Sequence, residues 1–195
     1  MRGTIALRII STFFPMIVLC KERATPMTNI SKGDMVSQYV QMYWKIAVEE
    51  DELYGIPASI TLAQGIIESN CGRSTLAKKH NNHFGVKWRK GRKESYAVFR
   101  DDTPRDRFVV YNSAWFSFRD HSKVLKADRY KSLYKDRNYK NWAHGLRRCG
   151  YATHPNYGYI VIKIIERYNL TRFDRYKKFK FNNKKKWSIF KKLKL

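Results

Sequence analysis

A single carboxylate closes a short apolar helix that the sequence predicts over residues 57–69. Apolar side chains recur along this helix at helical spacing, and Glu68 lies off their stripe beside Gln64. Burial beside apolar groups disfavours the charged form of a carboxyl group, and a general acid that works near neutrality needs that property. The position of Glu68 therefore allows a general acid, although this stretch alone favours the alternative. The alternative is an ordinary solvated glutamate near a helix end.

Two further carboxylates, Asp101 and Asp102, lie in a charged loop between two short extended runs. The runs Ser95–Phe99 and Phe108–Tyr111 read as a β-hairpin. The loop places both aspartates at or near the rim of this hairpin. Their local alternative is a structural one, in which they cap the turns of the loop.

Metal and thiol chemistry find little support in the sequence. The three cysteines match no zinc motif, and the five histidines form no HExxH pattern. A Cys71–Cys149 disulfide would require an oxidising compartment, and we favour free thiols. A Cys71 thiolate nucleophile lacks an accompanying Cys–His–Asn pattern. We therefore expect no metal and no cofactor.

The elements that would position Glu68 and the aspartates are mostly helices. Periodicity and turn residues predict helices over 35–53, 75–79, 113–126, 130–134, 138–148 and 156–168. The first of these ends in an acidic run, Glu49 to Glu52, which we interpret as a solvated helix face. The hairpin over 95–111 is the only clear β signal.

Composition predicts one folded domain with extensions. The chain has 195 residues, 43% of them apolar and 15% aromatic, which is enough for a real core. Its net charge of +24 points to polyanionic partners, namely nucleic acid, anionic lipid or an acidic cell-wall polymer.

The two ends differ from the middle of the chain. Residues 1–26 have a basic start and an apolar run that Arg8 interrupts, so they read as a signal or an anchor, unless Met27 or Met35 is the true start. Residues 175–195 form a basic tail with interleaved aromatics. Such a tail binds anionic envelope polymers, membrane surfaces or nucleic acid, or is simply solvated.

An ordered set of segments over residues 35–174 resembles the glucosaminidase domain of glycoside hydrolase family 73, which comprises bacterial peptidoglycan hydrolases such as autolysins and flagellar muramidase-like proteins. The segments are YGIPASITLAQGIIESNCGRS, NNHFGVK, the Asp101-Asp102 loop, VYNSAWFSFRDHSKVL, GYATHPNY and IIERYNLTRFD.

The resemblance implies a mainly α, lysozyme-like α+β fold, in which a helical lobe and a small β-hairpin lobe flank a glycan-binding cleft. It implies an endo-β-N-acetylglucosaminidase that cleaves the β-1,4 bond between N-acetylglucosamine and N-acetylmuramic acid, with Glu68 as the general acid. The expected partners are peptidoglycan strands rather than nucleic acid. We expect a monomer that is secreted or acts at the cell envelope.

The second catalytic group is less determined. The resemblance favours Asp101 or Asp102 on the hairpin, with Glu94 as a further candidate. A distant base would activate water with inversion, a close carboxylate would attack the sugar, and the substrate's own acetamido group could also serve. The matching motifs assign substrate contacts to five residues. These are Gln64, Asn82, Phe84, Tyr151 and Tyr157.

Two other functions stay open at this point. A lytic transglycosylase would use one acid on a similar fold and yield anhydro-muramyl ends. A non-catalytic basic module would bind nucleic acid or anionic membrane through residues 172–195.

Overall fold

The computed structural model describes residues 31–101 and 103–176. The predicted signal or anchor at 1–26, the second aspartate Asp102 and most of the basic tail, from residue 177 onward, lie outside the described residues. None of the helices in the described ranges is both long enough and apolar enough to cross a membrane.

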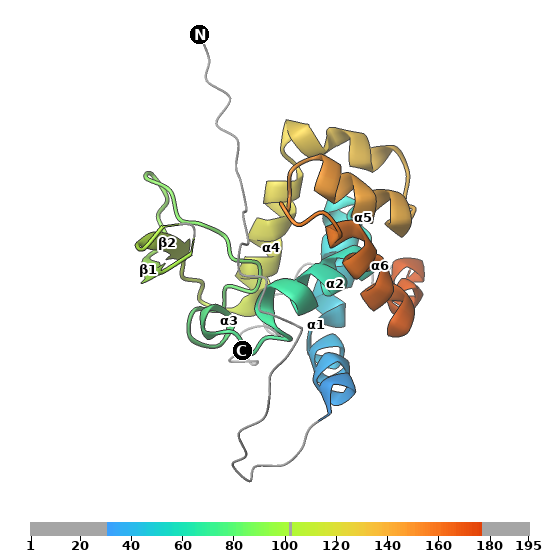
Figure 1. Cartoon of the computed structure of the whole chain (residues 1–195), viewed down its shortest axis with the longest axis horizontal. Helices are drawn as coiled ribbons and strands as arrows, with labels where there is room; N and C mark the ends of the chain where they lie inside the picture. Colours follow the sequence, from blue (N-terminus) through green and yellow to red (C-terminus); the bar gives the residue numbers. More distant parts are fainter. Residues whose placement is uncertain (1–30, 102, 177–195) are drawn as a thin grey trace, which may run out of the picture.

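Helices dominate the described part, and one hairpin stands beside them (Figure 1). The α-helices are Lys32–Tyr54 (α1), Ala58–Ser69 (α2), Thr75–His80 (α3), Ala114–Leu125 (α4), Tyr139–Arg148 (α5) and Tyr157–Arg167 (α6). The strands are Tyr96–Phe99 (β1) and Asp106–Val109 (β2), and two 3-10 helices cover Asp128–Lys135 (η1) and Leu170–Arg175 (η2). The predicted fold class, mainly helical with a small β-hairpin, is confirmed.

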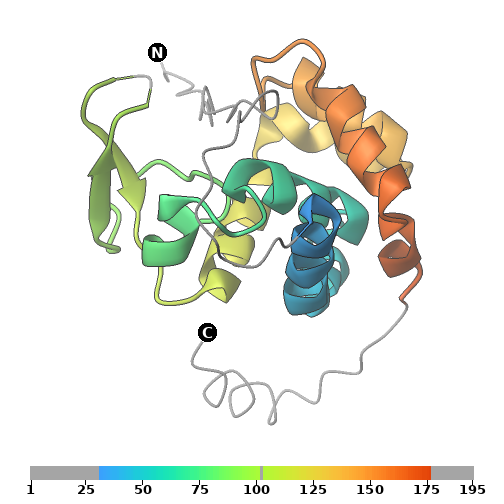
Figure 2. The same ribbon diagram turned by 60° about the horizontal axis from the view of Figure 1, so that its bottom comes forward.

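Helix α2 lies at the centre of this arrangement. It contacts α1, α5, α6 and η2, and Figure 2 shows it between the hairpin with α3 on one side and α5 with α6 on the other. Every residue of α2 except Glu68 is buried. The interpretation of α2 as a helix with a single buried face is therefore wrong, because neighbouring helices enclose it. Pro57 caps α2 in an extended conformation instead of occupying its first turn.

Local signals define both ends of α1. The Ser31 hydroxyl accepts a hydrogen bond from the Asp34 amide, and the Asp34 carboxylate accepts one from the Ser31 amide, which makes a capping box. At the other end Gly55 takes a left-handed conformation with φ 73°, and its amide donates to the Asp51 carbonyl.

Glu49, Glu50 and Asp51 at the acidic end of α1 are buried and only Glu52 is exposed, so the interpretation of this run as a solvated face is wrong for its first three residues. Arg119 of α4 contacts Glu50 at 2.8 Å and Glu49 at 3.1 Å, and Arg137 contacts Asp51 at 2.6 Å. Burial raises the pKa of Glu50, although Arg119 opposes the shift. The charge run therefore fastens α1 to α4 and to the segment before α5.

The hairpin pairs antiparallel, with Tyr96 opposite Val109 and Phe99 opposite Asp106. Its second strand begins two residues earlier than predicted and ends at Val109. The Val110 amide still donates across the hairpin to the Ser95 carbonyl, but the backbone of Tyr111 bonds to another element. The Tyr111 amide donates to the His80 carbonyl, and the Asn81 side chain donates to the Tyr111 carbonyl. These bonds anchor the base of the hairpin to the end of α3.

Candidate active site

Glu68 lies in the last turn of α2, where the chain reverses sharply. Asn70 and Gly72 adopt left-handed backbone conformations with φ 50° and 75°. The Ser69 hydroxyl donates to the Gly65 carbonyl and accepts from the Gly72 amide, which closes the turn. The turn fixes the helix end and leaves Glu68 as the one partly exposed residue of α2.

A tyrosine from α6 holds the Glu68 carboxylate. The Tyr157 hydroxyl donates to Glu68 Oε1 at 2.9 Å, and the Gln64 amide nitrogen donates to the same hydroxyl at 3.2 Å. Burial, together with the charge of Glu68, raises the pKa of Tyr157 well above its ordinary value. The phenol therefore stays a neutral O–H donor, and it orients the Glu68 carboxylate through Oε1.

A second buried tyrosine, Tyr151, lies close enough to Glu68 for the charge of that carboxylate to affect its pKa. Burial first and then that charge raise the pKa of Tyr151. Its hydroxyl has no hydrogen-bond partner within the described part of the chain. The Tyr151 ring lies edge-on to His121 of α4, at 5.9 Å between centroids, and 5.7 Å from the Tyr157 ring. The two tyrosines and His121 thus form an aromatic layer behind the acid.

His121 is a neutral, packed member of this layer. It stacks on Phe84 with 3.9 Å between centroids, and burial lowers its pKa to about 3. Neither ring nitrogen has a hydrogen-bond partner among the residues that the structure describes. No sequence signal indicated that the His121 ring would lie beside the candidate site.

A close approach between α1 and α2 supports the acid from the other side. A Cβ atom on Gly65 would lie 2.4 Å from the Tyr39 hydroxyl oxygen, so only glycine fits there. The Tyr39 hydroxyl shares a hydrogen bond of 3.1 Å with His83 Nδ1, and burial lowers the pKa of His83 to about 4. Sequence reasoning missed this contact, for which the glycine inside an apolar helix was the available signal.

The predicted substrate contacts lie mostly behind the surface. Asn82 is 1% exposed, and its side chain bonds to the backbone of Val86 and to the carbonyl of Val109. Phe84, Gln64 and the two tyrosines are likewise buried. All five side chains are thus buried in this structure, and their contact with substrate stays a prediction.

The predicted second acid lies on the hairpin lobe. Asp101 is in the loop between β1 and β2, and its carboxylate contacts the Lys87 ammonium at 3.1 Å. Glu94 instead pairs with Arg92, which chiefly lowers the pKa of that carboxyl. Asp102 is outside the described residues. The role of a hairpin carboxylate stays a prediction.

Two of the three cysteines, Cys71 and Cys149, lie within the described residues. Neither Cys71 nor Cys149 forms a disulfide within the described residues, and the Cys149 sulfur lies 3.9 Å from the Ser132 hydroxyl. No group of three or more His, Cys, Asp or Glu side chains in residues 31–101 and 103–176 could hold a metal ion.

Comparison with known proteins decides the family. A family model described as Glucosaminidase, mannosyl-glycoprotein endo-beta-N-acetylglucosaminidase, matches residues 44–170. The chain belongs to this glucosaminidase family. Exo-glucosaminidase LytG of Bacillus subtilis is 36% identical over 137 residues, which cover 63% of this chain and 48% of that protein. The prediction of a glycoside hydrolase domain from the peptidoglycan hydrolase family is confirmed.

Solved structures agree with this assignment. The catalytic domain of the autolysin Auto from Listeria monocytogenes matches with a TM-score of 0.60 and 25% identity, over 78% of this chain and 91% of that one. The glycoside hydrolase domain of FlgJ from Salmonella typhimurium has a TM-score of 0.61 at 22% identity, covering 80% and 98%, and shows the shared fold. The chain spans about half the length of the Bacillus relative.

Proposed function

We propose that this domain hydrolyses the glycan strands of peptidoglycan as an endo-β-N-acetylglucosaminidase, with Glu68 as the general acid. The observation that carries the proposal is the setting of Glu68. It is the one residue of α2 that is not buried, and the neutral Tyr157 hydroxyl holds its carboxylate. The bond that we propose for cleavage is the β-1,4 bond between N-acetylglucosamine and N-acetylmuramic acid.

The chemistry asks two things of the protein. A carboxylic acid must protonate the leaving oxygen, and a second group must stabilise or attack the developing oxocarbenium ion. Glu68 supplies the proton, while Tyr157 fixes its orientation. We assign the second role to the hairpin aspartates, Asp101 or Asp102, which the loop would bring over the sugar ring from the opposite lobe.

One observation supports a runner-up reaction. The Asp101 carboxylate is paired with the Lys87 ammonium at 3.1 Å, whereas Glu68 is the carboxylate that the Tyr157 hydroxyl orients. A single acid is what a lytic transglycosylase uses. Mass spectrometry of the products separates the two reactions, because hydrolysis leaves a reducing N-acetylglucosamine end and the transglycosylase leaves an anhydro-muramyl end.

The place of action follows from the substrate. We propose that the protein works at the cell envelope or outside the cell, where peptidoglycan lies. The net charge of +24 supports attraction to an anionic envelope. The names of two relatives, an exo-glucosaminidase and an autolysin, describe those proteins and agree with an envelope substrate.

The test is Glu68→Gln on purified peptidoglycan. Replacing the acid with an isosteric amide should lower the rate by about 10²- to 10⁴-fold, the usual contribution of a general acid. Glu166→Gln is the matched control, since Glu166 is an exposed glutamate near the end of α6 that pairs with Lys140. EDTA should leave the rate unchanged. Lysis by a folded Glu68→Gln variant at the wild-type rate refutes the assignment, and a wild type that only binds anionic polymers favours the non-catalytic module.

A further inference from the structure

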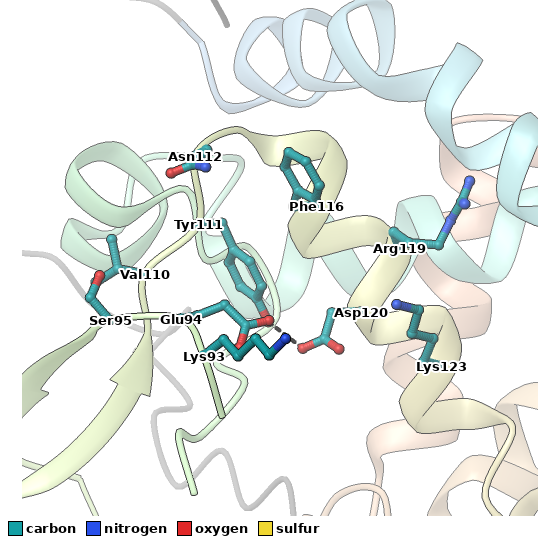
Figure 3. Close-up of a pocket in the computed structure, with 10 residues that line it drawn as sticks. All are labelled: Lys93, Glu94, Ser95, Val110, Tyr111, Asn112, Phe116, Arg119, Asp120 and Lys123. Atoms are coloured by element: carbon teal, nitrogen blue, oxygen red, sulfur yellow. Dashed lines mark hydrogen bonds between the residues drawn. The ribbon is translucent and has the colours of Figure 1, made fainter. Parts of the chain in front are cut away.

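A separate cavity of about 440 Å³ lies where the base of the hairpin meets α4 (Figure 3). Its walls come from the residues before β1, the residues after β2 and the outer face of α4. The volume is in the range of sites that take small ligands. Helix α4 presents His121 to the tyrosine layer behind Glu68 but Asp120 and Lys123 to this cavity. The cavity and the candidate acid therefore lie on different sides of α4.

Most charges in the cavity wall are already paired. Arg92 contacts Asp120 at 2.5 Å and Glu94 at 3.4 Å, and the Tyr111 hydroxyl donates to Asp120 at 2.6 Å. The Arg119 guanidinium turns toward α1, where it binds the two buried glutamates. These contacts hold the side chains of the cavity wall in defined positions.

The remaining charges in the cavity wall are the ammonium groups of two lysines. Lys93 and Lys123 form no ion pair within the described part of the chain, and Figure 3 shows them on either side of the Asp120 carboxylate. Phe116 and the Tyr111 ring supply an apolar part of the cavity wall, above both lysines in the view of Figure 3. Such a site attracts a carboxylate that is attached to an apolar or amide-rich body.

The two carboxylates in the cavity wall, Glu94 and Asp120, restrict the class of ligand that the cavity can bind. Glu94 is partly exposed, and with Asp120 it would repel a polymer that carries only negative charge. The exposed Glu94 carboxylate, whose contact with Arg92 is the longer one at 3.4 Å, would accept an ammonium group. A short peptide with carboxylates and a free amine satisfies both signs, whereas a phosphodiester polymer satisfies one.

We propose that this cavity binds the acidic peptide attached to the glycan strand, so that the domain recognises peptide as well as sugar. The proposal rests on peptidoglycan as the substrate. A peptide of four or five residues spans about 13–18 Å when extended. A helix that is ~10–12 Å wide with its side chains has a half-circumference of about 16–19 Å. Of these peptides, only a fully extended one of five residues is about long enough to reach around α4 from a strand near Glu68.

The experiment compares two substrates and two double variants. The substrates are glycan strands that keep their peptides and the same strands after an amidase has removed the peptides. Lys93→Gln with Lys123→Gln removes both free ammonium groups. Lys90→Gln with Lys131→Gln is the control, because it removes the same charge from exposed lysines outside the cavity.

We expect the wild type and the control to prefer peptide-bearing strands, and the Lys93/Lys123 variant to lose about tenfold of that preference in kcat/KM. It should cleave peptide-free strands as the wild type does. A wild type without preference, or a cavity variant that keeps it, overturns the inference while the hydrolase function stands. A wild type that cleaves neither substrate overturns the proposed function instead.

A binding experiment tests the cavity directly. A synthetic tetrapeptide with two carboxylates and one amine is titrated into the Glu68→Gln variant. Absence of binding, or displacement of the peptide by a phosphodiester polymer alone, refutes the inference.

Discussion

The hydrogen bond between Tyr157 and Glu68 offers the sharpest test of the site. Tyr157→Phe deletes one hydroxyl and keeps the ring that packs beside Tyr151. If Tyr157 positions the acid, the variant should lose activity while its aromatic layer stays in place. The residue contacts the candidate acid itself, so the change acts on orientation rather than on the supply of the proton.

The magnitude follows from the two bonds that the hydroxyl makes. A hydrogen bond to a charged group contributes about 1.5–3 kcal/mol, and each 1.36 kcal/mol is about tenfold in rate. We therefore expect kcat/KM to fall by roughly 10- to 100-fold. The variant also leaves the buried Gln64 amide without its acceptor. That loss should lower the free energy of unfolding by about 1–3 kcal/mol.

The assay pairs turnover of purified peptidoglycan with urea unfolding. Tyr134→Phe is the control, because its hydroxyl donates to the Leu125 carbonyl at 3.2 Å, on the backbone rather than on the acid. It should lose about 0.5–1.5 kcal/mol of stability and keep its kcat/KM. A Tyr157→Phe protein whose kcat/KM stays within threefold of wild type would show that this bond does not position the acid.

Two further predictions concern stability. Gly65→Ala should destabilise the protein by about 1–3 kcal/mol in urea unfolding, since the new methyl group meets the Tyr39 hydroxyl; an exposed helical site would gain from the same change, so a stabilised variant contradicts the close approach. Burial lowers the pKa of His121 to about 3, so only the unfolded state binds its proton between that value and about 6.5. Stability should therefore fall as the pH drops below about 6.5, by up to about 1.4 kcal/mol per pH unit for this histidine. His121→Gln should flatten that slope, and an unchanged slope would mean that His121 is not the group that titrates.

The helices and the acid could be predicted because their signals are local. The apolar spacing of α2, the left-handed turn after it and the alternation of the hairpin all lie within a few residues of the element they define. Glu68 at the end of α2 was therefore accessible to sequence reasoning, as was the family. The end of β2 was predicted two residues late, since the bonds of Tyr111 to His80 and Asn81 override the local pattern there.

What the sequence by itself determined is the order of the elements and the one acid that chain reversal leaves partly exposed. The tertiary structure alone decided which side chains meet that acid. Tyr157 is 89 residues from Glu68, and Arg119 reaches Glu50 across 69 residues to bury a run that looked solvated. Periodicity tells which face of an element is apolar, but not which distant element covers it. The partners of a buried carboxylate depend on that packing, and so does the chemistry it can perform.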